Sequence, residues 1–447
     1  MRKQWLKVFG TVLLLMTLLL GSCGQAVEQS TEKNTEDKPE ESVSETESEK
    51  DSETETDEMP KNIFDFDGSV SEATLRAYLS RAVTISTTLD TKKSYIKNFI
   101  LDVGAKYICR AATCWSPSAS DYDTYGGQKT FINAVHRSDS DVVFEACLFE
   151  CVNKKGVGSI PIPAWVFEAF DQPVEERNFD YDKMVFENGQ YKDQWGTDSS
   201  VPDMTRLETK MFFYYRACKY IDTGYEALHM GQVYLMGRND KKWEHYTALT
   251  SMIRDYASTH ARRHFVFLNA HVKGIIDADG YLMFDFHMWP SRLYSGEKDA
   301  EGNEVAYVRV GHVDSIYGMS MGGLTHSGWT CEHLPYLVEL DNFGDSQSIG
   351  SRTPDTIYVW GYDEITWFAN QSDAYRKEFI LTIIDQVRTV DEDGYFALPG
   401  ERVARIYDSE GNIIKWAYYA YDKSQFKDGF GDQAAIKEAF ASREIGD

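Results

Sequence analysis

FLNAHVKGIIDADGYLMFDFHMWP, residues 267–290, is the stretch on which the predicted fold depends. Two apolar runs that can form strands flank a turn sequence, Asp-Ala-Asp-Gly, at 277–280. No helix fits between the two runs, and parallel strands need a crossover of about a dozen residues or more. A three-residue loop that ends in a left-handed Gly280 therefore predicts an antiparallel hairpin.

The hairpin register predicts a cluster of polar side chains. It places His271 opposite His287 and Lys273 opposite Asp285, so that one face carries two imidazoles and a carboxylate. His271, Asp285 and His287 could bind zinc or another divalent cation, or hydrogen-bond to substrate hydroxyls. Because no close-spaced motif such as His-x-His occurs, we prefer hydrogen bonding and assign no metal ligand.

Outward from this stretch, strand-like and helix-like runs alternate over residues 62–447. Strands are predicted at 105–115, 142–152, 225–231, 264–272, 336–344, 356–364 and 394–400. Helices are predicted at 69–83, 128–137, 204–221, 243–261 and 372–387, with a final hairpin around 408–411 and a last helix at 432–442. This alternation indicates a parallel sheet. We predict an α/β fold, a single (β/α)8-type (TIM-like) barrel with inserted hairpins, although only seven strands are counted. An open doubly wound sheet is the alternative, but no Gly-rich phosphate loop follows an early strand.

Barrel enzymes place reactive groups at the carboxyl ends of their strands. In YLVELDNFG, Glu339 and Asp341 alternate onto the face opposite the apolar set. The proximity of two carboxylates raises the pKa of one of them, which suits a general acid. Glu150, at the end of another strand, is the candidate for the second catalytic carboxylate. The alternative is a pair of carboxylates held by arginine, lysine or a cation.

Further polar and aromatic residues fall late in strands or in the loops that follow them. Those expected to bind substrate through hydrogen bonds are His229, Gln232, Asn269, His271, Asp285 and His287. Aromatic rings in such positions give flat surfaces on which sugar rings stack. The candidates for this role are Trp115, Trp289 and Trp360, and core packing is the alternative for each.

The amino-terminal segment 1–23 has a basic start, a short apolar run and the ending Leu-Gly-Ser-Cys. This ending resembles the lipobox of bacterial lipoproteins. The resemblance implies cleavage before Cys23, a lipid on that residue, and a protein tethered to the outer face of the bacterial cell membrane. Residues 24–60 contain 14 acidic residues, three lysines and no aromatic residue. Segment 24–61 is therefore expected to be a disordered stalk.

The formal net charge of −25 disfavours binding to nucleic acid, whose phosphates are also negative. Cys147 and Cys151 lie about 13 Å apart in an extended strand, beyond disulfide reach. Buried free thiols are expected, and a Cys109–Cys147 bridge between neighbouring strands stays open.

Tryptophan, histidine, asparagine and paired carboxylates at the strand ends make residues 62–447 similar in architecture to the barrel glycoside hydrolases, although no family motif such as Asn-Glu-Pro occurs. The resemblance implies a carbohydrate substrate and two catalytic carboxylates, one from Glu339 or Asp341 and the other Glu150. The alternatives are a metal-dependent hydrolase that uses His271, Asp285 and His287, and a carbohydrate-binding lipoprotein without catalysis. No cofactor is expected.

Overall fold

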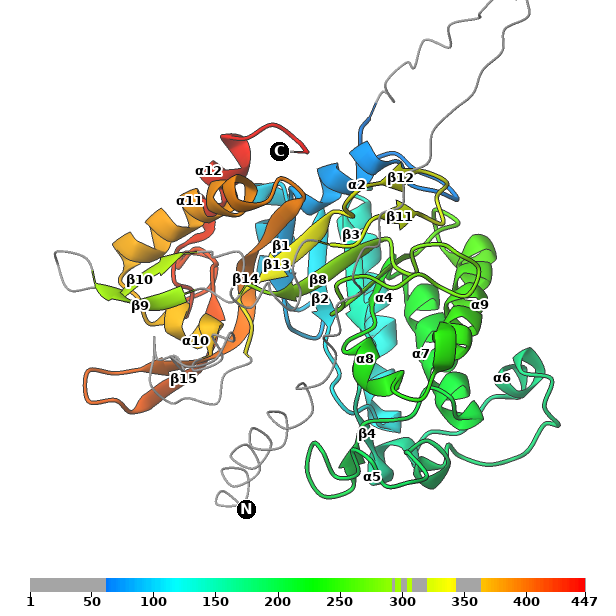
Figure 1. The fold of residues 1–447 in the computed structure, drawn as a ribbon. Helices are drawn as coiled ribbons and strands as arrows, with labels where there is room; N and C mark the ends of the chain where they lie inside the picture. The colour runs from blue at the N-terminus through cyan, green and yellow to red at the C-terminus, as the bar shows by residue number, and fades with distance from the viewer. Residues whose placement is uncertain (1–61, 292–293, 299–303, 308–319, 343–362, 447) are drawn as a thin grey trace, which may run out of the picture. The chain divides into compact units, whose positions relative to one another are not determined.

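Eight parallel strands form a closed barrel in the computed structural model (Figure 1), which describes residues 62–291, 294–298, 304–307, 320–342 and 363–446. The order around the barrel is β1-β2-β3-β6-β7-β8-β13-β14, and β1 also pairs with β14, which closes the sheet. The bounds are β1 Ala82–Ile85, β2 Tyr107–Ala112, β3 Val143–Cys147, β6 Ala227–His229, β7 Phe267–Ala270, β8 Phe286–Pro290, β13 Tyr336–Glu339 and β14 Gly394–Tyr407. The predicted barrel is confirmed, with eight strands.

Amphipathic helices connect most of the barrel strands and cover the outside of the barrel. Figure 1 shows α4, α7 and α9 along one flank and α11 and α12 along another. These helices are α3 Ser94–Val103, α4 Tyr125–His136, α7 Leu207–Thr223, α9 Glu244–His260, α10 Glu364–Ala369, α11 Asp373–Val390 and α12 Gln433–Ala441. All the predicted helices are present, although α2, Glu72–Leu79, ends four residues before the predicted end. The sequence does not predict α3 or α10.

The strand periodicity divides the core into two parts. Alternate residues of the strands, such as Tyr107, Phe267 and Phe286, fill the barrel interior, and the residues between them pack against the surrounding helices. The amino end of the barrel is closed by α2, whose Tyr78 packs edge-on against Phe267 with ring centroids 5.8 Å apart. The carboxyl end is the end at which barrel enzymes place their reactive groups.

The segment between β7 and β8 corrects the predicted hairpin. Its tip has the expected register, since the Asp277 amide donates to the Tyr281 carbonyl at 2.8 Å and Gly280 has a left-handed φ of +94°. The antiparallel pairing continues through Ile276 and Leu282 to the Met283 amide, which donates to the Ile275 carbonyl at 3.0 Å, but β8 runs parallel to β7 with Ala270 beside His287. The prediction that His271 faces His287 is therefore wrong. The 15 residues 271–285 are enough for a parallel crossover without a helix.

Two further differences concern the strand count. The run Ala82–Ile85 forms β1, although the sequence predicts the end of a helix there, because four residues are too few to show a period. The predicted strand at 356–364 lies almost entirely in 343–362, outside the described residues. Since β13 pairs directly with β14, the barrel has no strand between them.

The remaining elements are short and lie outside the barrel. The predicted carboxyl-terminal hairpin is confirmed, since β14 continues antiparallel to β15, Ile413–Tyr419, with Gly411 donating to Asp408 at the turn. Short helices and strands fill the loops: α5 Lys154–Val157, α6 Ala164–Ala169, α8 Val233–Met236, β4 Val152–Asn153, β5 Ser199–Ser200, β9 Tyr294–Lys298, β10 Glu304–Tyr307, β11 Gly323–Leu324 and β12 Thr330–Cys331. Residues 63–447 make one compact unit. None of the helices in the described ranges is long and apolar enough to cross a membrane.

Candidate active site

Arg110, two residues before the end of β2, has a strained backbone conformation. Its φ is +58°, which is uncommon for a residue other than glycine. The β2–β3 pairing shifts register between Ile108 and Ala112, and such irregularities re-aim side chains at the ends of strands. Here the backbone amide of Arg110 donates to Glu145 at 3.0 Å, and its side chain turns toward Glu339 on β13.

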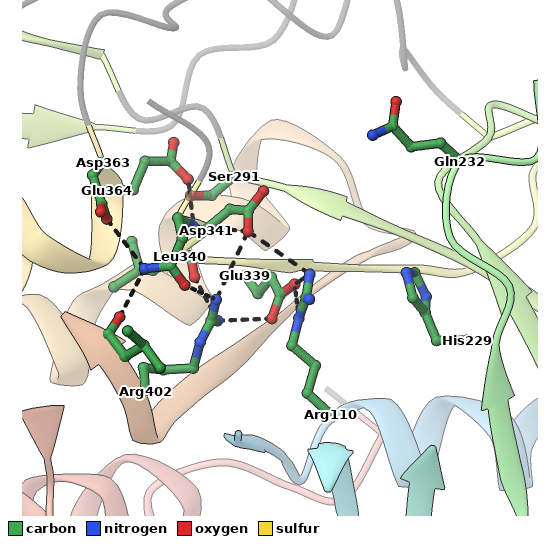
Figure 2. Close-up of polar contacts among 12 residues, drawn as sticks. Arg110, His229, Gln232, Ser291, Glu339, Leu340, Asp341, Asp363, Glu364 and Arg402 are labelled. Atoms are coloured by element: carbon green, nitrogen blue, oxygen red, sulfur yellow. Dashed lines mark hydrogen bonds and ion pairs between the residues drawn. The ribbon is translucent and has the colours of Figure 1, made fainter. Parts of the chain in front are cut away.

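Glu339 is held between two arginines at the carboxyl end of the barrel. Arg110 Nε donates to its Oε1 at 2.5 Å, and Arg402 Nη1 donates to its Oε2 at 2.9 Å. Figure 2 shows the two guanidinium groups reaching the carboxylate from two sides. Glu339 is fully buried, so its negative charge depends on these partners. The sequence allows the VELDN carboxylates to be interpreted either as a catalytic pair or as carboxylates held by arginine, lysine or a cation. For Glu339, the structure shows a carboxylate held by arginine.

Asp341 lies one strand repeat beyond Glu339 and within reach of the same arginines. Its Oδ1 is 3.8 Å from Arg110 Nη2 and 3.8 Å from Arg402 Nη2. The backbone amide of Asp341 donates to Glu364 at 3.1 Å, which fixes the strand end against α10. Asp341 retains 8% exposure, whereas Glu339 has none. The prediction that both side chains point to one face of β13 is confirmed, and Asp341 is the outer one.

A chain of buried hydrogen bonds determines which ring nitrogen of His229, at the end of β6, carries the proton. Tyr107 and Asn269 both donate to Glu145 Oε2 at 2.8 Å. Because the Asn269 amide nitrogen is used in this way, its Oδ1 must accept from His229 Nδ1, 2.6 Å away. His229 therefore carries its proton on Nδ1 and presents the lone pair of Nε2. Among the described residues, nothing donates to that Nε2.

The imidazole of His229 is neutral because it is buried. Burial is the main cause that lowers its pKa, and the charge of Arg110 lowers it further. A neutral imidazole with an open lone pair can accept a hydrogen bond from a hydroxyl group or take a proton. The ring of His271 packs against it with centroids 4.6 Å apart. The sequence-predicted residues His229, Asn269 and His271 are thus brought together.

Glu150 follows β3 and lies in a different environment from Glu339. It is 2% exposed and accepts hydrogen bonds from Gln232, one from the backbone amide at 3.1 Å and one from the side chain at 2.9 Å. Burial raises the pKa of Glu150, and the bonds from Gln232 and the charge of Arg110 only partly oppose this shift. Burial thus shifts Glu150 toward the protonated form, which is the form that a general acid uses.

An aromatic group stands beside Glu150. The ring of Trp115 lies 5.3 Å from Phe149 and 5.1 Å from Trp195. Trp195 also donates its indole N–H to the Glu150 carbonyl at 2.9 Å. Trp115 is 42% exposed, so one of its surfaces can stack on a ligand.

Three of the sequence-predicted residues on β8 or next to it do not join this group. Phe286 packs into the barrel interior, and therefore Asp285, His287 and Trp289 lie on the outer face of the strand by alternation. Asp285 is ion-paired with Arg254 at 3.1 Å, and His287 Nδ1 lies 2.5 Å from the Ser320 hydroxyl. Burial lowers the pKa of His287 to about 3, so it is a neutral core residue.

The alternative metal set consequently has no geometric basis. His271, Asp285 and His287 are not brought together, and the described residues contain no group of three histidine, cysteine or acidic side chains placed to hold a metal. The six cysteines from Cys109 onward are free, which agrees with the expected thiols and not with a Cys109–Cys147 bridge. Trp360 and Cys23 lie outside the described residues.

Sequence reasoning assigned no role to three buried charged residues that hold the predicted site residues in place. Arg110 is the one charged residue in the apolar strand run ICRAA, and Glu145 is the one in VVFEAC. A single charge in a buried strand requires a buried partner, and that signal could have marked both. Arg402 gives a weaker signal, because the sequence around it, GERVARIY, contains several charges.

Comparisons with known proteins give only distant structural matches. No protein-family model and no curated protein matches the chain. A debranching enzyme from Nostoc punctiforme matches with 12% identity and a TM-score of 0.37, covering 81% of this chain and 82% of that one. The glycoside hydrolase domain of PelA from Pseudomonas aeruginosa matches with 8% identity and a TM-score of 0.31, covering 71% and 92%.

A third match is an alpha-galactosidase from Thermus thermophilus in complex with stachyose. Its identity is 12%, its TM-score is 0.26, and the match covers 45% of this chain and 44% of that chain. The chain thus spans less than half the length of this galactosidase. All three TM-scores are below 0.5, so the barrel assignment rests on the strand pairing and the functional assignment on the site itself.

Proposed function

We propose that residues 62–447 are a glycosidase-like hydrolase that acts on a carbohydrate. The observation that carries this proposal is the contrast between two carboxyl groups at the same end of the barrel. Glu150 is buried with a raised pKa, whereas Asp341 is more exposed and lies near two guanidinium groups. One group kept protonated and another kept ionised are what glycosidic bond cleavage requires.

In the proposed reaction, Glu150 donates its proton to the glycosidic oxygen while the bond to the anomeric carbon breaks. Asp341 supplies the negative charge, either by attacking the anomeric carbon or by removing a proton from water. Glu339 is ion-paired with Arg110 and Arg402 and positions those arginines beside Asp341. This assignment uses Asp341 and Glu150 as the reactive pair and gives Glu339 a positioning role.

The neighbouring residues suit recognition of a sugar. His229 Nε2 can accept a hydrogen bond from a hydroxyl group, since the chain through Asn269 and Glu145 fixes its protonation. Gln232 holds Glu150 in place, and Trp115 offers an exposed ring for stacking. A carbohydrate-binding protein without catalysis is the second candidate, because Glu339, one of the predicted catalytic carboxylates, is fully used in ion pairs.

Turnover of a glycan panel by the purified protein, with and without a metal chelator, tests this function. We expect release of sugar that the chelator leaves unchanged, and loss of release in Glu150→Gln as the matched inactive variant. Binding of a glycan by the wild type without any turnover would establish the second candidate instead. Loss of activity on chelation would favour a metal-dependent hydrolase.

We also propose that the chain is a surface lipoprotein anchored through Cys23, with segment 24–61 as its stalk. In bacteria that express the full chain, Cys23→Ser is expected to move most of the protein from the membrane fraction to the soluble fraction, because one thioether-linked lipid group would be lost. A variant with Cys331→Ser serves as the control for cysteine loss. Equal membrane association of Cys23→Ser and wild type would contradict the anchor.

A further inference from the structure

The helix layer outside the barrel contains a buried arginine that the proposed reaction does not use. Arg216 lies in the middle of α7 and is fully buried. Its Nη2 donates to the backbone carbonyls of Cys147 at 3.1 Å and Cys114 at 3.4 Å. Its Nε and Nη1 have no hydrogen-bond partner in the part of the chain that the structure describes. Two of its three nitrogens thus have no acceptor at normal hydrogen-bond distance, and the neutral hydroxyl of Tyr220, one turn further along α7, also interacts with the guanidinium.

The described surroundings of Arg216 supply no counter-charge. Its guanidinium lies 5.6 Å from the ring centre of Phe212 and 5.9 Å from that of Phe213, and no carboxylate of the described residues forms an ion pair with it. A buried charge without a partner is strongly destabilising. Contacts with aromatic faces offset only part of this destabilisation.

The polar groups near Arg216 are neutral donors. Burial raises the pKa of Tyr122 far above its ordinary value, and the charge of Arg216 opposes this shift. Burial likewise raises the pKa of the Cys114 thiol to about 11 and that of the Cys151 thiol to about 12, again against the charge of Arg216. None of these groups ionises near neutral pH, so none balances the arginine.

We propose that Arg216 binds a small monovalent anion, with chloride as the natural occupant. Nε and Nη1 are two donors on a positive group, and the Tyr122 hydroxyl is a third buried group that has no partner among the described residues. Water would satisfy these hydrogen bonds but would leave the charge unbalanced. A halide that accepted from these three donors would also neutralise the charge.

This anion site lies between the barrel and the helix layer, because Arg216 on α7 contacts the Cys147 carbonyl at the end of β3 and α4 packs on β3 through Phe131 and Phe144. Cys147, whose carbonyl Arg216 contacts, ends the strand that precedes Glu150. The anion would therefore stabilise the support of Glu150 without touching a substrate. The inference is independent of the proposed glycosidase reaction and holds for a binding protein as well.

The test is a halide titration of the purified full-length chain in sodium gluconate at constant ionic strength. We expect chloride and bromide to raise the Tm of the wild type saturably, by about 2 °C or more, because a ligand that binds only the folded state stabilises it. Arg216→Met should lose this response. Arg254→Met is the matched control, since Arg254 on the neighbouring α9 is already paired with Asp285, and its halide response should equal that of the wild type.

Two further measurements test the proposed anion site if Arg216→Met does not fold. Tyr122→Phe should raise the half-saturating halide concentration several-fold, and crystals soaked in bromide should show anomalous scattering beside the Arg216 guanidinium. A wild type without a saturable halide response would overturn the proposal. So would a retained response in Arg216→Met, or density at this position without an anomalous signal, which would identify water.

Discussion

Glu150→Gln should lower kcat/KM for the hydrolysed glycan by about 10²- to 10⁴-fold, the contribution typical of one general acid. Glutamine keeps the size of the side chain and can still accept a hydrogen bond from Gln232, but it has no proton to give to the glycosidic oxygen. The measurement is initial-rate kinetics on the glycan found in the panel. A substrate whose leaving group needs no protonation, such as an activated aryl glycoside, should show a much smaller loss.

The same substitution should change stability in a pH-dependent way. Burial raises the pKa of Glu150 above its ordinary value of 4.5, so the folded state keeps a proton that the unfolded state releases. Stability of the wild type then falls as pH rises through the window above 4.5, whereas glutamine contributes no such dependence. We therefore expect the Tm of Glu150→Gln relative to wild type to increase between pH 5 and pH 8.

Glu168→Gln is the matched control, because Glu168 is an exposed glutamate on α6. It should change neither kcat/KM nor the pH dependence of Tm. A Glu150→Gln enzyme with near-wild-type activity on an ordinary glycan would remove Glu150 from the reaction. Unchanged pH dependence of its stability would show that Glu150 is ionised in the folded protein.

The sequence predicts most of the barrel because its strands are apolar runs flanked by amphipathic helices. The exceptions are segments in which the local sequence signal and the pairing with distant strands favour different structures. Ala82–Ile85 is too short to show a strand period and follows a helix within three residues. The turn at 277–280 is real, but the partner of β8 is decided by β13, which lies beside it with Tyr336 next to His287. A local turn signal contains no information about that distant strand.

The candidate site was predictable to a similar extent. Strand position and alternation identified Glu150, His229, Asn269 and Asp341, because both are local properties. They did not identify what each group contacts. The sequence places Glu339 beside Asp341 as a candidate acid, but it does not show that two arginines from positions far away in the sequence surround Glu339. A pKa depends on charges within a few ångströms in space, and these come from positions that lie far apart in the sequence.

Arg402→Met should destabilise the folded chain by about 3–5 kcal/mol, the cost of leaving a buried charge without one of its partners. Arg402 is 1% exposed. Besides its bond to Glu339, it donates to the Leu340 carbonyl at 2.6 Å and to Asn342 at 3.1 Å. Methionine fills similar volume but supplies neither charge nor donors. Urea unfolding gives the free energy, and the shift in midpoint at constant slope isolates stability.

A comparison with a surface ion pair separates the effect of burial on stability from the effect of ion pairing alone. Arg206→Met breaks a pair with the exposed Glu187 and should cost no more than about 1 kcal/mol. The double variant Arg402→Met/Glu339→Gln should be more stable than Arg402→Met alone, because the uncompensated carboxylate is gone. If Arg402→Met costs as little as Arg206→Met, Glu339 does not depend on Arg402 for its charge. Arg110 alone would then be sufficient to hold Glu339. The proposed role of Glu339 in positioning both arginines beside Asp341 would be contradicted.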